Sequence, residues 1–209
     1  MQEQMERLKK IKTSCRTIRG FLWIMMGIMA LFAVLYVWYG LKVAAAPESA
    51  FTVTENRFGG LSMDMAGQNF QVGSSVPYYA TPMGIRGEYS AKTLQLVNMG
   101  LGMALVLLPF SVVIWKILGI LKRVMAGESP FCEGNIRAVK AVGYILLFLG
   151  LAAKILYLLG ITYLVFKGNV SGKSFLMDYM VAFVGGLLLV LARIFEYGSY
   201  LQSEYDATL

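Results

Sequence analysis

The sequence predicts an all-α integral membrane protein: a four-transmembrane-helix bundle with cytoplasmic N and C termini and a small β-like extracellular loop. Of its 209 residues, 57% are hydrophobic and only 15% are charged, and the mean hydropathy is +0.62. These values are typical of membrane proteins and exclude a conventional soluble core. Four apolar stretches also reach the length of about 20 residues that a spanning helix needs. They are Phe21–Tyr39, Leu94–Trp115, Ala141–Phe166 and Phe175–Phe195.

Basic residues set the predicted orientation. Twelve of the 19 lysines and arginines fall in the N-terminal segment, between the second and third spans, or, as Arg193, at the C-terminal end. Six fall on the opposite side, so both ends are expected in the cytoplasm. The net charge of +7 is then explained by the orientation of the chain in the membrane and by attraction to anionic lipid at the cytoplasmic face. No aromatic-interleaved basic patch indicates direct nucleic-acid binding.

The first element is predicted as a cytoplasmic basic helix over 1–20 that continues into the first span over 21–45. Its apolar residues recur at helical spacing, and the basic residues could grip anionic lipid or a partner helix, or could merely fix orientation. A signal peptide is the alternative, because Ala44 and Ala46 form a cleavage-like pattern. That alternative is rejected, since a secretory apolar core is at most about 15 residues long.

Residues 46–92 are predicted as an extracellular β-like loop, because apolar and polar residues alternate between glycine-containing turns. Three short strands are expected, too small to be stable alone, so the sheet should rest on the helices. Two roles stay open: reception of an extracellular ligand, or a lid that ties the first span to the second. The residues expected on one face are Phe51, Val53, Leu61, Met63, Met65, Phe70 and Val72.

The second span, over 93–125, is predicted to extend into the cytoplasm until Gly127 ends it. Ser129 and Pro130 are expected to begin the next helix as its cap and first residue. That helix, over 129–167, leads into the third span. An extracellular loop over 168–174 and the fourth span with its cytoplasmic tail, over 175–209, complete the chain.

Three helices carry apolar stripes into the cytoplasm, at the inner ends of the second, third and fourth spans. These stripes either pack on one another or dock a cytoplasmic partner. Aromatic and charged residues beside them form the candidate cytoplasmic interaction face. It consists of Phe131, Arg137, Arg193, Glu196 and Tyr200.

The stretch "GESPFCEGNIRAVKAVGYILLFLG", followed by "LARIFEYGSYLQSEYDATL", resembles the bacterial membrane proteins of domain-of-unknown-function family 2975. The resemblance is at the level of motifs over about 120–209 and of layout before that. It implies four spans and a bacterial cell (plasma) membrane, and it supplies no activity. Members of the family tend to be encoded beside small helix-turn-helix regulators, which implies a possible cytoplasmic regulatory partner.

Lys154 is a charged residue near the middle of the third span, where a lysine costs about 3 kcal/mol or more. No acidic residue is expected within a span, and Glu196, beyond the fourth, is the nearest. Pro109 cannot donate to the carbonyl of Leu105, so a turn of the second span should open at a similar depth. We therefore expect the second and third spans to be neighbours, with the Lys154 amine donating near Leu105 and Val106.

Asn98 and Ser111 could extend this polar track, which gives the candidate intramembrane polar site Lys154, Leu105, Pro109, Asn98 and Ser111. The site could hold an anionic or hydrogen-bond-accepting group. Alternatively, Lys154 snorkels towards the headgroups or seals the turn opened by Pro109.

Enzymatic chemistry has little support in the sequence. It has no histidine and only two cysteines, Cys15 and Cys132, both expected in the cytoplasm, so a zinc site, a disulfide and a cofactor are not expected. Ser111 and Lys154 could be imagined as nucleophile and base, but nothing places them together. The Gly185-Gly186 pair is typical of close helix packing rather than of a phosphate-binding loop.

Two functions remain. The leading hypothesis is a non-enzymatic sensor, anchor or regulatory partner that links the extracellular cap to the cytoplasmic helical face. The alternative is a small permease or transporter subunit that uses Lys154. Because four spans are few for a transporter, the alternative would require a homo-oligomer.

Overall fold

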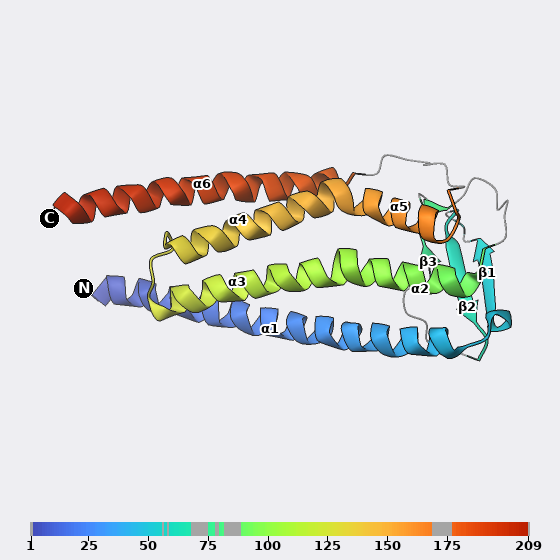
Figure 1. Cartoon of the computed structure of the whole chain (residues 1–209). Helices are drawn as coiled ribbons and strands as arrows, with labels where there is room; N and C mark the ends of the chain where they lie inside the picture. The colour runs from blue at the N-terminus through green and yellow to red at the C-terminus, as the bar shows by residue number, and fades with distance from the viewer. Residues whose placement is uncertain are drawn as a thin grey trace. The chain divides into compact units, whose positions relative to one another are not determined.

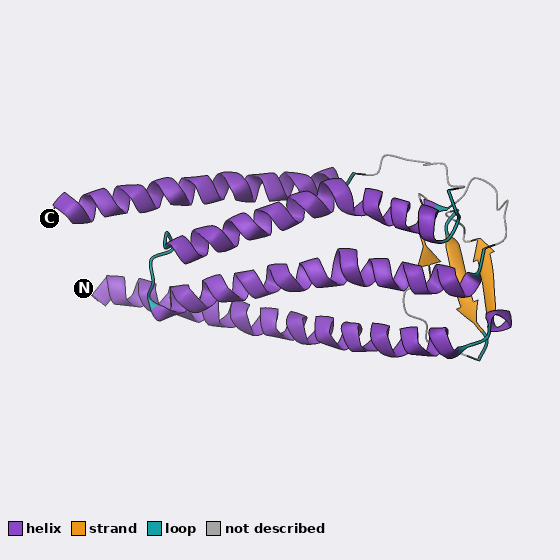
Figure 2. Cartoon of the chain, in the orientation of Figure 1, coloured by secondary structure: helices purple, strands orange, loops and turns teal. Residues whose placement is uncertain are grey.

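The computed structural model describes residues 2–55, 57, 59–67, 75–77, 80–81, 89–168 and 177–208. They are mostly helical, with one small sheet (Figures 1 and 2). Within these residues, four helical stretches are long and apolar enough to cross a membrane, which fits the predicted multi-pass protein. These stretches are Lys12–Ala45, Ala91–Ala126, Glu133–Leu164 and Tyr179–Tyr205.

The first span belongs to one continuous helix, α1 (Gln2–Ala45), so the predicted basic helix and the first span are a single element. The second stretch comprises α2 (Ala91–Gly102) and α3 (Leu108–Ala126), and the third comprises α4 (Glu133–Phe148) and α5 (Lys154–Leu164). The fourth is α6 (Tyr179–Thr208), which begins four residues later than the predicted span. The sidedness of the termini and of the sheet stays a prediction.

The chain divides into two compact units. The first unit comprises Met1–Met29, Phe110–Phe148 and Met180–Leu209. The second comprises Ala30–Pro109 and Leu149–Tyr179. The sheet therefore belongs to the second unit, and most of α3, α4 and α6 belongs to the first.

A three-stranded antiparallel sheet forms in the second unit, in the order β1 (Phe51–Glu55), β2 (Leu61–Met65) and β3 (Ser75–Val76). The register pairs Val53 with Met63 and Leu61 with Val76. Side chains alternate between the two faces of a strand, so one apolar face forms, as predicted. The predicted strand residues Phe70 and Val72 lie outside the described residues.

The apolar face of the sheet packs on helices, which confirms the expectation that it rests on them. Leu61, Met63 and Val76 form one buried cluster with Leu94 of α2 and Ile161 of α5. A second cluster joins the sheet to α1 and α2. It contains Tyr39, Val43, Phe51, Met65 and Met99.

In the same unit, polar contacts join the segment that follows α1 to the start of α2. Lys92 Nζ donates to the carbonyl of Ala46 at 2.8 Å, and the Ser90 hydroxyl donates to Glu48 Oε1 at 2.7 Å. Ser90 Oγ also accepts the backbone N–H of Thr93 at 3.1 Å, which caps α2. Just before this cap, burial raises the pKa of the Tyr89 hydroxyl. These contacts favour the alternative in which the loop ties the first span to the second.

Both middle spans are interrupted by π-helical turns, η3 (Met103–Leu107) and η4 (Leu149–Ala153). In η3 the N–H of Leu108 bonds to the carbonyl of Met103, five residues earlier. The turn directly precedes Pro109, whose missing N–H and bulky ring disfavour a regular α-turn there. The prediction that Pro109 opens the helix near Leu105 is therefore confirmed.

In the first unit, α3 ends as predicted at Gly127, whose φ is +91°. The N–H groups of Glu128 and Gly127 bond to the carbonyls of Arg123 and Val124, which is the Schellman pattern. The predicted helix start at Ser129 and Pro130 is wrong. The helix α4 begins at Glu133, because the carbonyl that accepts the first helical N–H, from Ile136, belongs to Cys132.

Two helices of the first unit, α4 and α6, approach closely at glycines. A Cβ atom on Gly185 would lie 2.5 Å from the backbone nitrogen of Leu147 and 2.8 Å from the carbonyl oxygen of Gly143. Only a residue without a side chain permits such backbone proximity. Gly185 is therefore a packing position, as the sequence predicted, whereas Gly186 has open space around it.

Candidate functional site

The polar site of the second unit is centred on an ion pair. Lys154 is the first residue of α5, and its Nζ lies 3.6 Å from Oδ2 of Asp178. The expectation that no acidic residue lies near Lys154 is wrong. Asp178 falls inside the predicted fourth span but precedes α6 in the structure, where its carboxylate faces the lysine of the preceding helix.

The backbone fixes Asp178 at this position. Its N–H donates to the carbonyl of Gly150 at 2.7 Å, and Gly150 lies within η4. Asp178 also directly precedes the N-terminus of α6, where an acidic group is electrostatically favoured. The lysine and aspartate side chains are 36% and 41% exposed, so an incoming group could reach both charges.

Asn98 belongs to a neighbouring polar network. Its Nδ2 donates to the carbonyl of Ser75 at 3.0 Å, and its Oδ1 accepts the hydroxyl of Tyr157. Tyr157 lies three residues after Lys154, on the same side of α5. The network therefore connects the buried Asn98 of α2 with strand β3 and with the helix that carries the ion pair.

The second and third spans are neighbours, as predicted. Besides the bond between Asn98 and Tyr157, a Cβ atom on Gly160 would lie 2.8 Å from Leu101 Cδ1. The structure places the Asp178 carboxylate 3.6 Å from the Lys154 amine. Donation to the carbonyls of Leu105 and Val106 stays a prediction.

The remaining predicted polar residues occupy different places. Leu105 lies in η3, and Pro109 is the second residue of α3. Ser111 belongs to the first unit, whereas Lys154 belongs to the second. The structure thus brings Lys154 and Asn98 to one region and adds Asp178 and Tyr157. Two signals could have identified these additions: an acidic residue within a predicted span, and a tyrosine one turn from Lys154.

Replacement of Asn98 by leucine should destabilise the protein by about 1–2 kcal/mol. The substitution leaves the Ser75 carbonyl and the Tyr157 hydroxyl without their Asn98 partner, and each lost partner of a buried group is costly. Thermal unfolding in lipid nanodiscs measures the effect. Tyr157→Phe is the matched comparison, because it removes one of the two bonds and should cost about half as much. Equal stability of Asn98→Leu and the unsubstituted protein would contradict this role.

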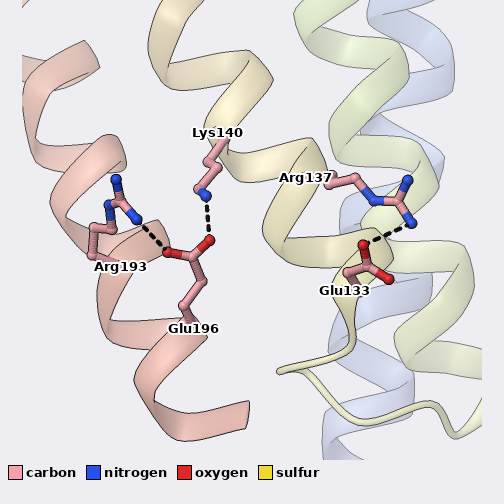
Figure 3. A network of polar contacts seen from close by, with 5 residues as sticks. All are labelled: Glu133, Arg137, Lys140, Arg193 and Glu196. Atoms are coloured by element: carbon pink, nitrogen blue, oxygen red, sulfur yellow. Dashed lines mark hydrogen bonds and ion pairs between the residues drawn. The ribbon is translucent and has the colours of Figure 1, made fainter. Parts of the chain in front are cut away.

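The candidate cytoplasmic interaction face contains a three-residue charge cluster in the first unit (Figure 3). Glu196 of α6 pairs with Lys140 of α4 and, at 2.9 Å, with Arg193 one turn earlier on α6. Glu196 is therefore shared between two cations and joins the two helices. Lys140 was absent from the predicted face, although its charge was evident in the sequence.

Aromatic contacts extend this junction between α4 and α6. The Phe131 ring packs edge-on against Phe195 with 5.4 Å between centroids, and it also lies over Gly198. The Ser129 hydroxyl donates to Gln202 Oε1 at 2.9 Å. The segment before α4 is thus packed on α6, which supports the alternative in which the apolar stripes pack on one another.

Other residues of the predicted face remain accessible. Arg137 pairs with Glu133 at 3.2 Å, and both side chains are more than 70% exposed. Figure 3 shows this pair pointing away from α6. Tyr200, which is also exposed, bonds to Glu204. The structure therefore gathers Phe131, Glu196 and Arg193 at the junction and leaves Arg137 and Tyr200 outside it.

No group of three potential metal ligands occurs among the described residues. Cys15 and Cys132 are free thiols.

Residues 71–209 match the family described as "Protein of unknown function (DUF2975)". No curated protein and no solved structure matches the chain.

Proposed function

Because the chain belongs to the DUF2975 family, whose function is unknown, we propose its function from its own residues. The chain is a non-enzymatic membrane protein that acts as a sensor, anchor or regulatory partner. It links an extracellular cap, the sheet of the second unit, to a cytoplasmic helical face on the first unit. The bacterial plasma membrane is its proposed location.

The observation that supports this proposal most directly is the position of the two π-turns. In the two middle spans, the chain passes between the units after Pro109 and before Leu149. Turn η3 ends two residues before the first boundary, and η4 starts at the second. Such turns interrupt the regular hydrogen-bond ladder and are frequent at functional sites. Each middle span therefore has a π-turn at or within two residues of the point where the chain passes from one unit to the other.

The cytoplasmic part of the proposal rests on exposed side chains. Arg137, Arg193 and Tyr200 are all largely exposed, and the packed junction beside them fixes the helices that carry them. A rigid support with accessible arginine and tyrosine side chains suits a protein interface, where both residue types are enriched.

The test is affinity capture of the tagged full-length protein in mild detergent from membranes of its own host. A cytoplasmic protein should be recovered that depends on residues 117–140 or 194–209. Its recovery should fall at least tenfold with the combined changes Arg137→Gln and Tyr200→Ala. Tyr163→Ala is the control, because Tyr163 is also an exposed tyrosine but belongs to the second unit. Repeated failure to recover such a protein, or equal recovery with all variants, contradicts the proposal.

A small permease or transporter subunit is the second candidate, favoured by the Lys154–Asp178 pair. Ionisable groups within spans often mark substrate or proton pathways, and transporter sites are typically built at interrupted helices. The test is proton or anion flux into proteoliposomes. Flux should be lost with Lys154→Met and kept with Lys167→Met, which removes an exposed lysine instead. Absence of flux with the unsubstituted protein contradicts this candidate.

A further inference from the structure

A pocket of about 290 Å³ lies between α1 and α3, within the first unit. From α1, Arg19, Trp23 and Met26 line it at intervals of four and three residues. One face of a helix has this spacing. The matching face of α3 contributes Trp115, Gly119 and Lys122.

The pocket has a charged end and an apolar end. The helices α1 and α3 run in opposite directions (Figure 1), so Arg19 and Lys122 lie at the same end. Met26 and Trp115 lie at the other end, seven residues away along each helix. At 1.5 Å per residue, this separation is about 10 Å. The two cations thus lie at one end of the pocket, and its apolar remainder is long enough for several methylene groups.

Neither cation is neutralised by the described part of the chain, in which no ion pair or hydrogen bond involves Arg19 or Lys122. Arg19 is half-buried and Lys122 is exposed. A guanidinium group beside an ammonium group complements a phosphate, because arginine can bind two phosphate oxygens together. The charged end therefore suits a phosphate group.

The rest of the pocket suits an acyl chain. Trp23 and Trp115 remain 57% and 72% exposed, so the pocket opens at the outer surface of the helices. Tryptophan is favoured where lipid headgroups meet acyl chains. Gly119 leaves space in the wall, since a Cβ atom there would meet nothing within 4 Å.

We propose that this pocket binds one acidic phospholipid, with its phosphate on Arg19 and Lys122 and an acyl chain along the apolar wall. This inference is independent of the proposed function, because it involves neither the charge cluster of Glu196 nor the ion pair of Lys154. A soluble phosphate shares the headgroup chemistry but leaves the apolar part of the pocket empty.

Tryptophan quenching by brominated lipids tests the proposal on the full-length protein in vesicles. The chain has three tryptophans, and Trp38→Phe leaves only Trp23 and Trp115 as reporters. In phosphatidylcholine vesicles, brominated phosphatidylglycerol is added in increasing fraction, and brominated phosphatidylcholine is the comparison lipid. Half-maximal quenching should need an about thirtyfold lower fraction of the acidic lipid, since each basic residue contributes about 1 kcal/mol.

Substitutions separate the pocket from general surface charge. Arg19→Gln with Lys122→Gln should abolish the preference for phosphatidylglycerol. Arg16→Gln with Lys116→Gln removes the same charge from the same helices outside the pocket. This variant should retain the preference for phosphatidylglycerol. Gly119→Leu should fill the pocket and abolish saturable quenching, whereas Gly27→Leu, also in open space, should not.

Three results would overturn the proposal. The first is equal quenching by the two lipids in the protein with Arg19 and Lys122 intact. The second is equal loss of preference in the two charge variants. The third is removal of the preference by excess inorganic phosphate, which would assign the charged end to a soluble phosphate.

Discussion

Gly185→Ala is expected to lower the stability of the protein by about 3 kcal/mol, at the upper end of the usual cost of overpacking. The added methyl group would lie 2.5 Å from the backbone nitrogen of Leu147 and 2.8 Å from the carbonyl oxygen of Gly143. Backbone atoms cannot rotate away as a side-chain end can, so α4 and α6 must separate. The midpoint of thermal unfolding in lipid nanodiscs measures the loss.

Two further alanine substitutions complete this experiment. Gly186→Ala is the control, because its methyl group meets nothing within 4 Å and alanine favours a helix by about 1 kcal/mol over glycine. Gly143→Ala should be intermediate, since its nearest contact is the movable end of Leu189 at 2.8 Å. Equal stability of the Gly185 and Gly186 variants would show that the two backbones do not approach at Gly185.

Lys154→Met and Asp178→Asn should each destabilise the protein by about 2–3 kcal/mol, whereas the double variant should recover at least half of the summed loss. Each single change leaves one charge without its partner at 3.6 Å. An ion pair this exposed would contribute under about 1 kcal/mol in water. In apolar lipid surroundings, the charge that loses this partner should carry most of the about 3 kcal/mol cost of a charged residue in a membrane.

The chemistry of the variants isolates the charge. Asp178→Asn retains the backbone N–H that bonds to Gly150, and Lys154→Met retains most of the length of the side chain. Lys167→Met is the control for loss of a positive charge, because Lys167 is exposed beyond the end of α5. Unfolding in nanodiscs should leave this control within about 0.5 kcal/mol of the unsubstituted protein. Additive losses in the double variant would exclude coupling between Lys154 and Asp178.

The features that the sequence predicted correctly depend on local chemistry. Apolar length determines the four spans, and strand alternation places Leu61 and Met63 on the buried face. Gly127 ends a helix because its backbone adopts φ of +91°, which few other residues tolerate. Pro109 opens a turn because it lacks an N–H. Each of these outcomes follows from residues that are close together along the chain.

The features that escaped prediction depend on contacts between distant segments. Turn η4 contains no proline, and its Gly150 carbonyl bonds to the N–H of Asp178, 28 residues later. The ion pair of Lys154 with Asp178 becomes evident only when that bond places Asp178 beside α5. Ser129 has the chemistry of a helix cap, and its Oγ accepts the N–H of Phe131 at 3.3 Å, but the same hydroxyl donates to Gln202 of α6 and the helix begins only at Glu133. Local propensity does not specify which distant group competes for a polar side chain.

The length of α1 has a consequence for its surroundings. At 1.5 Å per residue, its 44 residues extend roughly 66 Å, whereas the hydrocarbon layer is about 30 Å thick. Containing the whole helix within that layer would require a tilt above about 60°, beyond the range of about 0–40° seen for membrane helices. In a membrane that α1 spans, about half of the helix would therefore lie outside the hydrocarbon layer.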